Sequence, residues 1–133
     1  MAIDYGKKRT GIAVTDTLHI TANGLCTVET PNLLTYLTEY IRKESVDTLV
    51  VGAPQRMSGE PSAIEKDIRR FIAQFKKRFP TIHVEREDER FTSKMAMNTM
   101  IAGGVKKMKR RTKSLVDQVS ATLILQSYLG NEL

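Results

Sequence analysis

The sequence predicts an α/β fold with a five-stranded mixed sheet and helices on both faces. Three short apolar segments lie close together near the start of the chain, which is typical of an antiparallel three-strand meander. Helix and strand patterns then alternate, which is typical of parallel strands joined by helices. A strongly apolar helical pattern closes the chain. Its length of 133 residues is that of one domain, which we assign to residues 1–133.

The first three strands are predicted at Ala2–Ile3, Gly11–Val14 and Leu25–Val28. A polar turn follows the first strand, and its Gly6 is able to adopt a positive φ. Thr30-Pro31 then predicts a helix start, with Thr as the cap and Pro at the first helical position. Apolar residues recur at helical spacing after it.

Thr48–Gly52 reads as a strand without alternation, which indicates burial on both faces. Ser62 and Glu65 form a capping box before an amphipathic helix that ends at Pro80. Ile82 and Val84 mark the last strand. The sequence then predicts two further helices separated by a basic segment, at 93–102 and 114–129.

The composition is that of an ordinary soluble protein, with 41% hydrophobic and 27% charged residues. No apolar run approaches the roughly 18 residues of a membrane span, and the first residues do not form a signal peptide. One cysteine excludes an internal disulfide, and with two histidines it cannot build a structural zinc site. We therefore expect a cytoplasmic protein without a membrane partner.

The positive charge is concentrated in one segment. The chain has 21 basic and 15 acidic residues, and residues 106–113 contain six basic and no acidic side chains. The whole formal excess of +6 is therefore in this segment. A solvated loop would explain it, but a concentrated cluster also suits a nucleic-acid backbone. Its basic residues are Lys106, Lys107, Lys109, Arg110, Arg111 and Lys113.

Four acidic residues are predicted to meet at one edge of the sheet. Asp4 ends the first strand, Asp88 and Glu89 follow the last strand, and Asp117 is in the first turn of the final helix. The carboxyl ends of parallel strands share an edge, outside which ligands bind. Clustered carboxylates repel one another unless a cation lies among them, and hard ions such as Mg²⁺ prefer carboxylate oxygens. Two such ions support phosphodiester hydrolysis without a histidine or cysteine nucleophile.

Each acid also has a simpler interpretation. Asp4 could accept hydrogen bonds from a turn, and the run 85–90 could be a solvated ladder of salt bridges. Ser114 and Asp117 have the spacing of a capping box before an apolar run, although a cap can also be a metal ligand. These alternatives stay open on position alone.

Four segments together resemble the YqgF/RuvX family over nearly the whole chain. Residues 4–16 (DYGKKRTGIAVTD) are similar to its opening motif, and residues 50–54 (VVGAP) with Gly59 to its Val-Val-Gly-x-Pro loop. Residues 88–93 (DERFTS) match its Asp-Glu-Arg signature, and residues 113–128 are similar to its terminal helix.

This resemblance implies an RNase H-like fold related to the resolvase RuvC. Members are described as nucleases for the 5′ end of pre-16S rRNA or as Holliday-junction resolvases. It implies a metal-dependent endonuclease, a hydrolase acting on ester bonds, that uses Mg²⁺ or Mn²⁺. Catalysis and metal binding would then be carried by Asp4, Asp88 or Glu89, and Asp117.

Two features depart from the family pattern. Only three residues precede Asp4, where family members usually have a few more apolar residues. Related nucleases usually place an acid at the end of the fourth strand, but this strand ends Val51-Gly52-Ala53-Pro54. The middle acid would therefore come from Asp88 or Glu89.

We expect a nucleic-acid partner, either pre-rRNA or branched DNA, bound by a monomer or a homodimer. Its phosphates would be held by the basic segment and by Lys7, Lys8, Arg9 and Arg90. One alternative is a non-catalytic RNA-binding factor for ribosome assembly, built on a nuclease scaffold. A sugar-kinase-like or heat-shock-chaperone ATPase is a further alternative, but such proteins need two domains of this kind.

Overall fold

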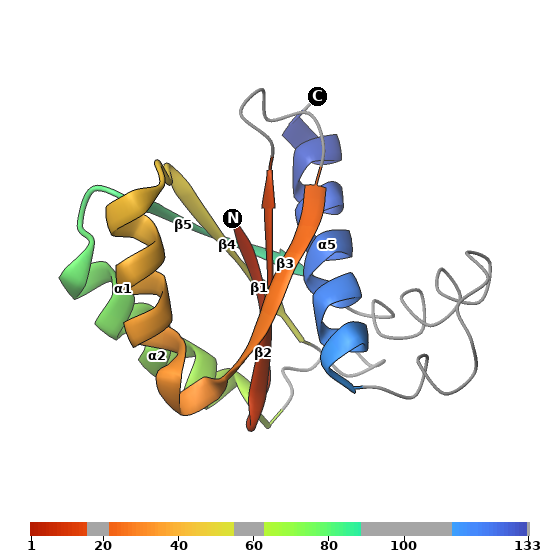
Figure 1. Ribbon diagram of the computed structural model, residues 1–133, viewed down its shortest axis with the longest axis horizontal. Coiled ribbons are helices and arrows are strands. Elements are labelled where there is room, and N and C mark those ends of the chain that lie inside the picture. The colour runs from red at the N-terminus through yellow and green to blue at the C-terminus, as the bar shows by residue number, and fades with distance from the viewer. Residues whose placement is uncertain (16–21, 55–62, 89–112, 133) are drawn as a thin grey trace.

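The computed structural model describes residues 1–15, 22–54, 63–88 and 113–132 (Figure 1). Five strands in these ranges form one sheet. The elements in chain order are β1 (Ala2–Tyr5), β2 (Arg9–Thr15), β3 (Ala22–Glu29), the 3₁₀ turn η1 (Thr30–Asn32), α1 (Leu33–Lys43), β4 (Thr48–Ala53), α2 (Glu65–Arg78), β5 (His83–Asp88) and α5 (Lys113–Glu132).

The strand order is β3-β2-β1-β4-β5. The pairs β1–β2 and β2–β3 are antiparallel, whereas β1–β4 and β4–β5 are parallel. Helices α1 and α2 cover one face, and α5 covers the other (Figure 1). The predicted fold class is confirmed. The helix predicted at 93–102 lies outside the described residues, as do residues 106–112 of the basic segment.

The face toward α1 and α2, called here the α1/α2 face, has the larger core. Ile3, Ile12 and Val51 are buried there against Leu37 of α1 and Phe75 of α2. Fully burying an aliphatic or aromatic side chain contributes roughly 1.5–3 kcal/mol. This core therefore holds the two helices on the sheet.

The opposite face, called here the α5 face, has a smaller core with smaller side chains. Ala2, Ala13 and Val50 are buried against Ala121 and Ile124 of α5. Small residues on the sheet allow the helix to approach closely. Val50 and its neighbour Val51 are buried on opposite faces, which confirms that this strand is covered on both sides. None of the helices in the described part is long and apolar enough to cross a membrane.

The predicted cap at Thr30 is wrong. Thr30 lies in the 3₁₀ turn, and the helix begins at Leu33. The hydroxyl of Thr30 donates to the carbonyl of Gly6 at 2.6 Å, and its backbone N–H donates to the carbonyl of Lys8 at 2.9 Å. The side chain therefore ties the start of α1 to the β1–β2 turn instead of capping the helix.

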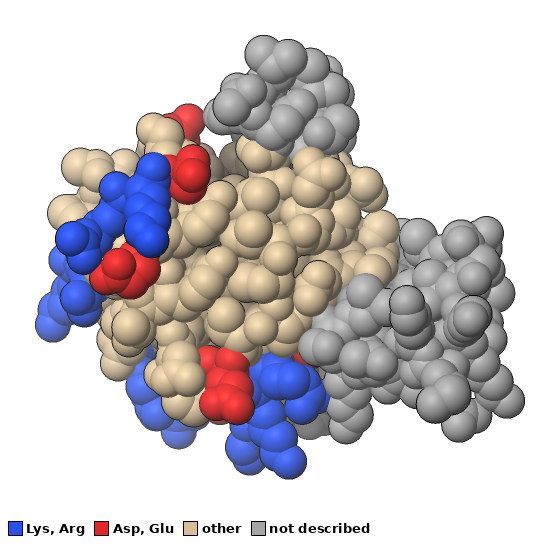
Figure 2. All heavy atoms as spheres, in the orientation of Figure 1, with Lys and Arg blue, Asp and Glu red and all other residues tan. Residues whose placement is uncertain are grey.

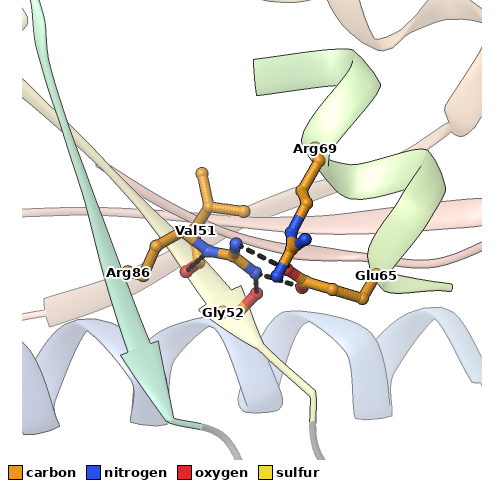
Figure 3. A network of polar contacts seen from close by, with 5 residues as sticks. All are labelled: Val51, Gly52, Glu65, Arg69 and Arg86. Carbon is orange, nitrogen blue, oxygen red and sulfur yellow. Dashed lines mark hydrogen bonds and ion pairs between the residues drawn. The ribbon is translucent and has the colours of Figure 1, made fainter. Parts of the chain in front are cut away.

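The predicted capping role of Glu65 is also wrong. Glu65 is the first residue of α2, and its nearly buried carboxylate accepts hydrogen bonds from Arg86 of β5 at 2.6 and 3.0 Å (Figure 3). Arg69 donates to the same carboxylate at 3.0 Å. Arg86 also donates to the carbonyls of Val51 and Gly52, at 3.2 and 3.0 Å. This network joins α2, β4 and β5, whereas Ser62 lies outside the described residues.

Removal of Arg86 should destabilise the protein because it leaves the carboxylate of Glu65 without its main partner. We expect Arg86→Ala to lower the free energy of unfolding by about 2–4 kcal/mol. The matched control is Arg42→Ala, which breaks the exposed pair with Glu39 and should cost at most about 0.5 kcal/mol. Urea unfolding of the three proteins measures the difference. Equal losses in the two variants would contradict this assignment.

The same network should make stability depend on pH. The hydrogen bonds from Arg86 hold the pKa of Glu65 below its ordinary value of 4.5, against the opposing effect of burial. A carboxyl group whose pKa is lower in the folded than in the unfolded state stabilises the protein at any pH above its unfolded-state pKa. This contribution is lost as the pH falls through the folded-state pKa. The stability difference between the parent and Glu65→Gln should thus be largest above about pH 4.5 and shrink in more acidic solution. Urea unfolding from neutral to acidic pH measures it, and a pH-independent difference would argue against the network.

Candidate active site at the carboxyl edge of the sheet

The carboxyl ends of β1, β4 and β5 lie along one edge of the sheet, as predicted. Ala2 pairs with Val50 and Ile3 with Val51 in parallel register. The next residue of β1, Asp4, is therefore level with Gly52, which itself pairs with Glu87 of β5. Asp4 is the third residue of β1, which continues to Tyr5, so the prediction that Asp4 ends this strand is off by one residue.

Side-chain alternation assigns each acid at this edge to a face of the sheet. Asp4 is two residues after Ala2, which packs on α5, so its side chain is on the α5 face. Glu87 is on the same face, since it accepts a 2.6 Å hydrogen bond from the hydroxyl of Ser127 in α5. Asp88, the exposed last residue of β5, is on the α1/α2 face together with Arg86. The register thus separates Asp88 from Asp4, and Glu89 lies outside the described residues.

Gly11 is the point at which α5 rests on the sheet. A Cβ at this residue would overlap the backbone carbonyl of Asp117, so the helix backbone lies directly against β2. Gly11 is also the cross-strand partner of Asp4. Asp4 and Asp117, from opposite ends of the chain, are therefore both next to Gly11 and on the same face of the sheet.

Arg9 balances part of the negative charge at this edge. Its Nε is 3.4 Å from Oδ2 of Asp117, and the side chains of Arg9 and Asp117 are 36% and 24% exposed. Arg9 is two residues before Gly11 on β2, so it is on the same face of the sheet. Asp117 is four residues after the first residue of α5, beyond the third helical position that a capping box uses. The structure thus directs its carboxylate toward Arg9.

Two of the predicted phosphate-binding residues lie in the β1–β2 turn. Lys7 and Lys8 are exposed there. The turn needs Gly6, because a Cβ at this residue would overlap the carbonyl oxygen of Arg9. In Figure 2, Lys and Arg side chains lie along the lower rim of the molecule, where Figure 1 draws this turn, and also along its left side, with acidic side chains among both groups. Lys113 begins α5. The remaining predicted basic residues lie outside the described ranges: Arg90, Lys106, Lys107, Lys109, Arg110 and Arg111.

Sequence reasoning missed the position of Glu87. Within the run 85–90, the sequence predicts Asp88 and Glu89 as site acids, with a solvated ladder of salt bridges as the alternative, and assigns no role to Glu87. The structure divides the described part of this run between the two faces, since Arg86 contacts Glu65 and Glu87 contacts Ser127. Because successive side chains of a strand point to opposite faces of the sheet, the alternation along this strand would have placed Arg86 and Glu87 on different faces.

Asp4 and Asp117 are the two predicted acids whose backbones the described structure places next to Gly11. Among the described residues there is no group of three or more His, Cys, Asp or Glu side chains able to hold a metal ion. The carboxylate oxygens of the two acids are donors that a hard divalent ion prefers. The guanidinium of Arg9 competes with such an ion for the carboxylate of Asp117.

The contact at Gly11 predicts a large effect of one methyl group. Gly11→Ala should lower the free energy of unfolding by about 1–3 kcal/mol, because the backbone of α5 must shift to admit the Cβ. Gly24→Ala on the adjacent strand is the matched control, since its Cβ would meet Thr122 Oγ1 at 3.4 Å, an ordinary contact. Thermal and urea unfolding measure both variants. A Gly11→Ala protein as stable as Gly24→Ala would show that the helix does not depend on this contact.

Comparison with known proteins identifies the family. The profile described as "RuvX: Holliday junction resolvase" matches residues 1–131. A protein of Christiangramia forsetii is 54% identical over 129 residues, which cover 97% of this chain and 96% of the relative. A protein of Bacteroides fragilis is also 54% identical over 129 residues, covering 97% and 94%. A protein of Flavobacterium psychrophilum is 49% identical over 133 residues, covering 100% and 97%.

All three relatives have the name "Putative pre-16S rRNA nuclease". The match covers the strand edge, the β1–β2 turn and the terminal helix, so the resemblance seen in the sequence motifs is confirmed. This chain belongs to the RuvX family.

Proposed function

We propose that this protein is a metal-dependent endonuclease that hydrolyses phosphodiester bonds of structured nucleic acid at the 5′ end of pre-16S rRNA. The observation that carries the proposal is the meeting of Asp4 and Asp117 beside Gly11 at the carboxyl edge of the sheet. The names of the relatives support an RNA substrate. The family description supports a branched DNA junction as the alternative substrate. Residues 1–133 would act as one nuclease domain in the cytoplasm.

We propose Mg²⁺, or Mn²⁺ in its place, as the cofactor of this site. Asp4 and Asp117 would hold it together with one acid of the pair Asp88 and Glu89. Glu89 is the better candidate of the two, because the register puts Asp88 on the opposite face from Asp4. The bound ion would lower the pKa of a water molecule and stabilise the leaving oxygen.

Other residues of the chain would position the two acids, offset their negative charge and bind the phosphates of the substrate. The sheet holds Asp4 on β1, and Gly11 lets α5 bring Asp117 beside it. Arg9 lowers the electrostatic cost of placing two carboxylates at one edge. Lys7 and Lys8, exposed in the adjoining turn, are suited to phosphates that flank the cleaved bond.

Asp4→Asn should abolish Mg²⁺-dependent cleavage and leave the fold intact, because the amide keeps the shape of the side chain and removes its charge. Asp47→Asn is the matched control, since Asp47 directly precedes β4 and so lies at the opposite, amino-terminal edge of the sheet. Cleavage of a precursor rRNA end and of a four-way DNA junction is measured side by side, together with the solution mass in the same buffer. The control should cut at the parent rate. An Asp4→Asn protein that also cuts at the parent rate would disprove the assignment, whichever substrate is used.

A pair of further variants, Asp88→Asn and Glu89→Gln, identifies the third acid. We expect the Glu89 variant to lose cleavage and the Asp88 variant to keep most of it. The reverse result would assign the metal to Asp88, and parent rates in both variants would exclude this pair from the site.

One structural feature favours a second candidate function, a non-catalytic RNA-binding factor for ribosome assembly. The residue of β4 that is level with Asp4 is Gly52, so this strand supplies no carboxylate at that level. Salt-sensitive binding of precursor rRNA, with no cleavage in either Mg²⁺ or Mn²⁺, would support this function over hydrolysis.

A further inference from the structure

A pocket of about 230 Å³, which is partly open to solvent and is called here the cavity, lies on the α1/α2 face, behind the edge that carries Asp4. Tyr5 follows Asp4 on β1, and its side chain therefore points to the other face of the sheet, where it lines this cavity. The 3₁₀ turn η1, the start of α1 and one side of α2 form the other walls. The volume is below the roughly 300–1,000 Å³ of sites for drug-sized ligands, so a single ring system is the appropriate size of occupant.

Two aromatic rings line the cavity. The ring centroids of Tyr5 and Phe71 are 5.6 Å apart, and the ring planes are tilted by 38°. Phe71 is buried, and Tyr5 is partly buried. Because Phe71 is only 6% exposed, its ring supports that of Tyr5, and the ring of Tyr5 is the face available for stacking on a nucleobase.

The polar side of the cavity offers hydrogen bonds to one edge of a planar ligand. Asp67 and Arg70 of α2 line it, together with the amide of Gln74. Neither charged side chain forms an ion pair with another residue in the described part of the chain. A carboxylate acceptor and a guanidinium donor are thus both available to a ligand. The Watson–Crick edge of guanine has the complementary pattern, with N–H donors beside the O6 acceptor.

The rim of the cavity is attached to the basic β1–β2 turn. Thr30, a lining residue, donates from its backbone N–H to the carbonyl of Lys8 at 2.9 Å and from its hydroxyl to the carbonyl of Gly6 at 2.6 Å. Lys7 and Lys8 are exposed in this turn. A base in the cavity would therefore have cationic side chains close to its own phosphates.

We propose that this cavity receives one unpaired guanine of the nucleic-acid substrate, with Asp67 accepting hydrogen bonds from its N1–H and N2–H groups and Arg70 donating to O6. The strand would pass from the cavity over Lys7 and Lys8 to the acids on the other face. This inference rests on the proposed nuclease function, because that function makes the bound guanine part of a substrate strand. The cavity would give the protein a preference for strands that contain an unpaired guanine.

Binding without cleavage tests the preference. The probes are fluorescently labelled RNA single strands of about 12 nucleotides, all uridine or uridine with one central guanosine or inosine. Anisotropy titrations in EDTA should show the guanosine strand binding at least about fivefold more tightly than the uridine strand. Inosine lacks the N2 amino group and should give an intermediate affinity.

Asp67→Asn should reduce the guanosine-to-uridine affinity ratio to about one and leave the affinity for the uridine strand unchanged. The matched control is Glu44→Gln, an exposed acid just after α1, which should keep the parent ratio. A parent protein without guanosine preference, or an Asp67→Asn protein that keeps it, would overturn the proposal. If the variant does not fold, the affinities of the parent protein for the guanosine, inosine and uridine strands test the proposal. Equal affinities for the three strands would overturn it.

The two proposals fail independently. Guanosine preference in EDTA without Mg²⁺-dependent cleavage would leave the base site in place and remove the nuclease function. Cleavage that depends on Asp4, together with equal binding of the guanosine and uridine strands, would support the nuclease function and overturn the base site.

Discussion

The close contact between the backbone of α5 and β2 at Gly11 is the constraint on which the candidate site depends. The two acids beside this contact come from the first strand and the last helix, and no local structure connects them. A glycine at the crossing lets the helix lie against the strand. Asp117 then reaches the level of Asp4, the cross-strand partner of Gly11. Arg9, two residues away on the same strand, supplies the charge that makes this approach less costly.

Two consecutive residues of β1, Asp4 and Tyr5, have their side chains on opposite faces of the sheet. Asp4 is on the α5 face, with the acids proposed for catalysis, and Tyr5 lines the cavity on the α1/α2 face. The period of two in a strand makes this division unavoidable. The β1–β2 turn follows immediately, and Thr30 ties it to α1. One short segment thus connects the acids, the exposed lysines and the cavity.

The end of β4 is supported from the α1/α2 face by Arg86. Its guanidinium binds the carbonyls of Val51 and Gly52 and the carboxylate of Glu65 at the same time (Figure 3). A strand that supplies no carboxylate at the level of Asp4 is therefore still held at that level by a charged network. The sequence-based interpretation of Glu65 as a capping residue failed for this reason. The guanidinium of Arg86, 21 residues away, binds the carboxylate of Glu65 in place of a backbone N–H at the start of the helix. Thr30 failed as a cap for the same physical reason, because the carbonyl of Gly6 takes its hydroxyl.

Local and periodic features of the sequence determined the elements and the class of fold. Apolar runs marked the strands, helical spacing marked α1 and α2, and the order of elements required parallel strands after a meander. The same order placed the carboxyl ends of three strands along one edge, with Asp4 on the first of these strands. Only the tertiary structure decided which side chains share a face at that edge, because strand register and helix docking depend on contacts between distant residues. It separated Asp88 from Asp4, paired Arg9 with Asp117 and formed the cavity at Tyr5, since each of these results depends on a neighbour that no local pattern specifies.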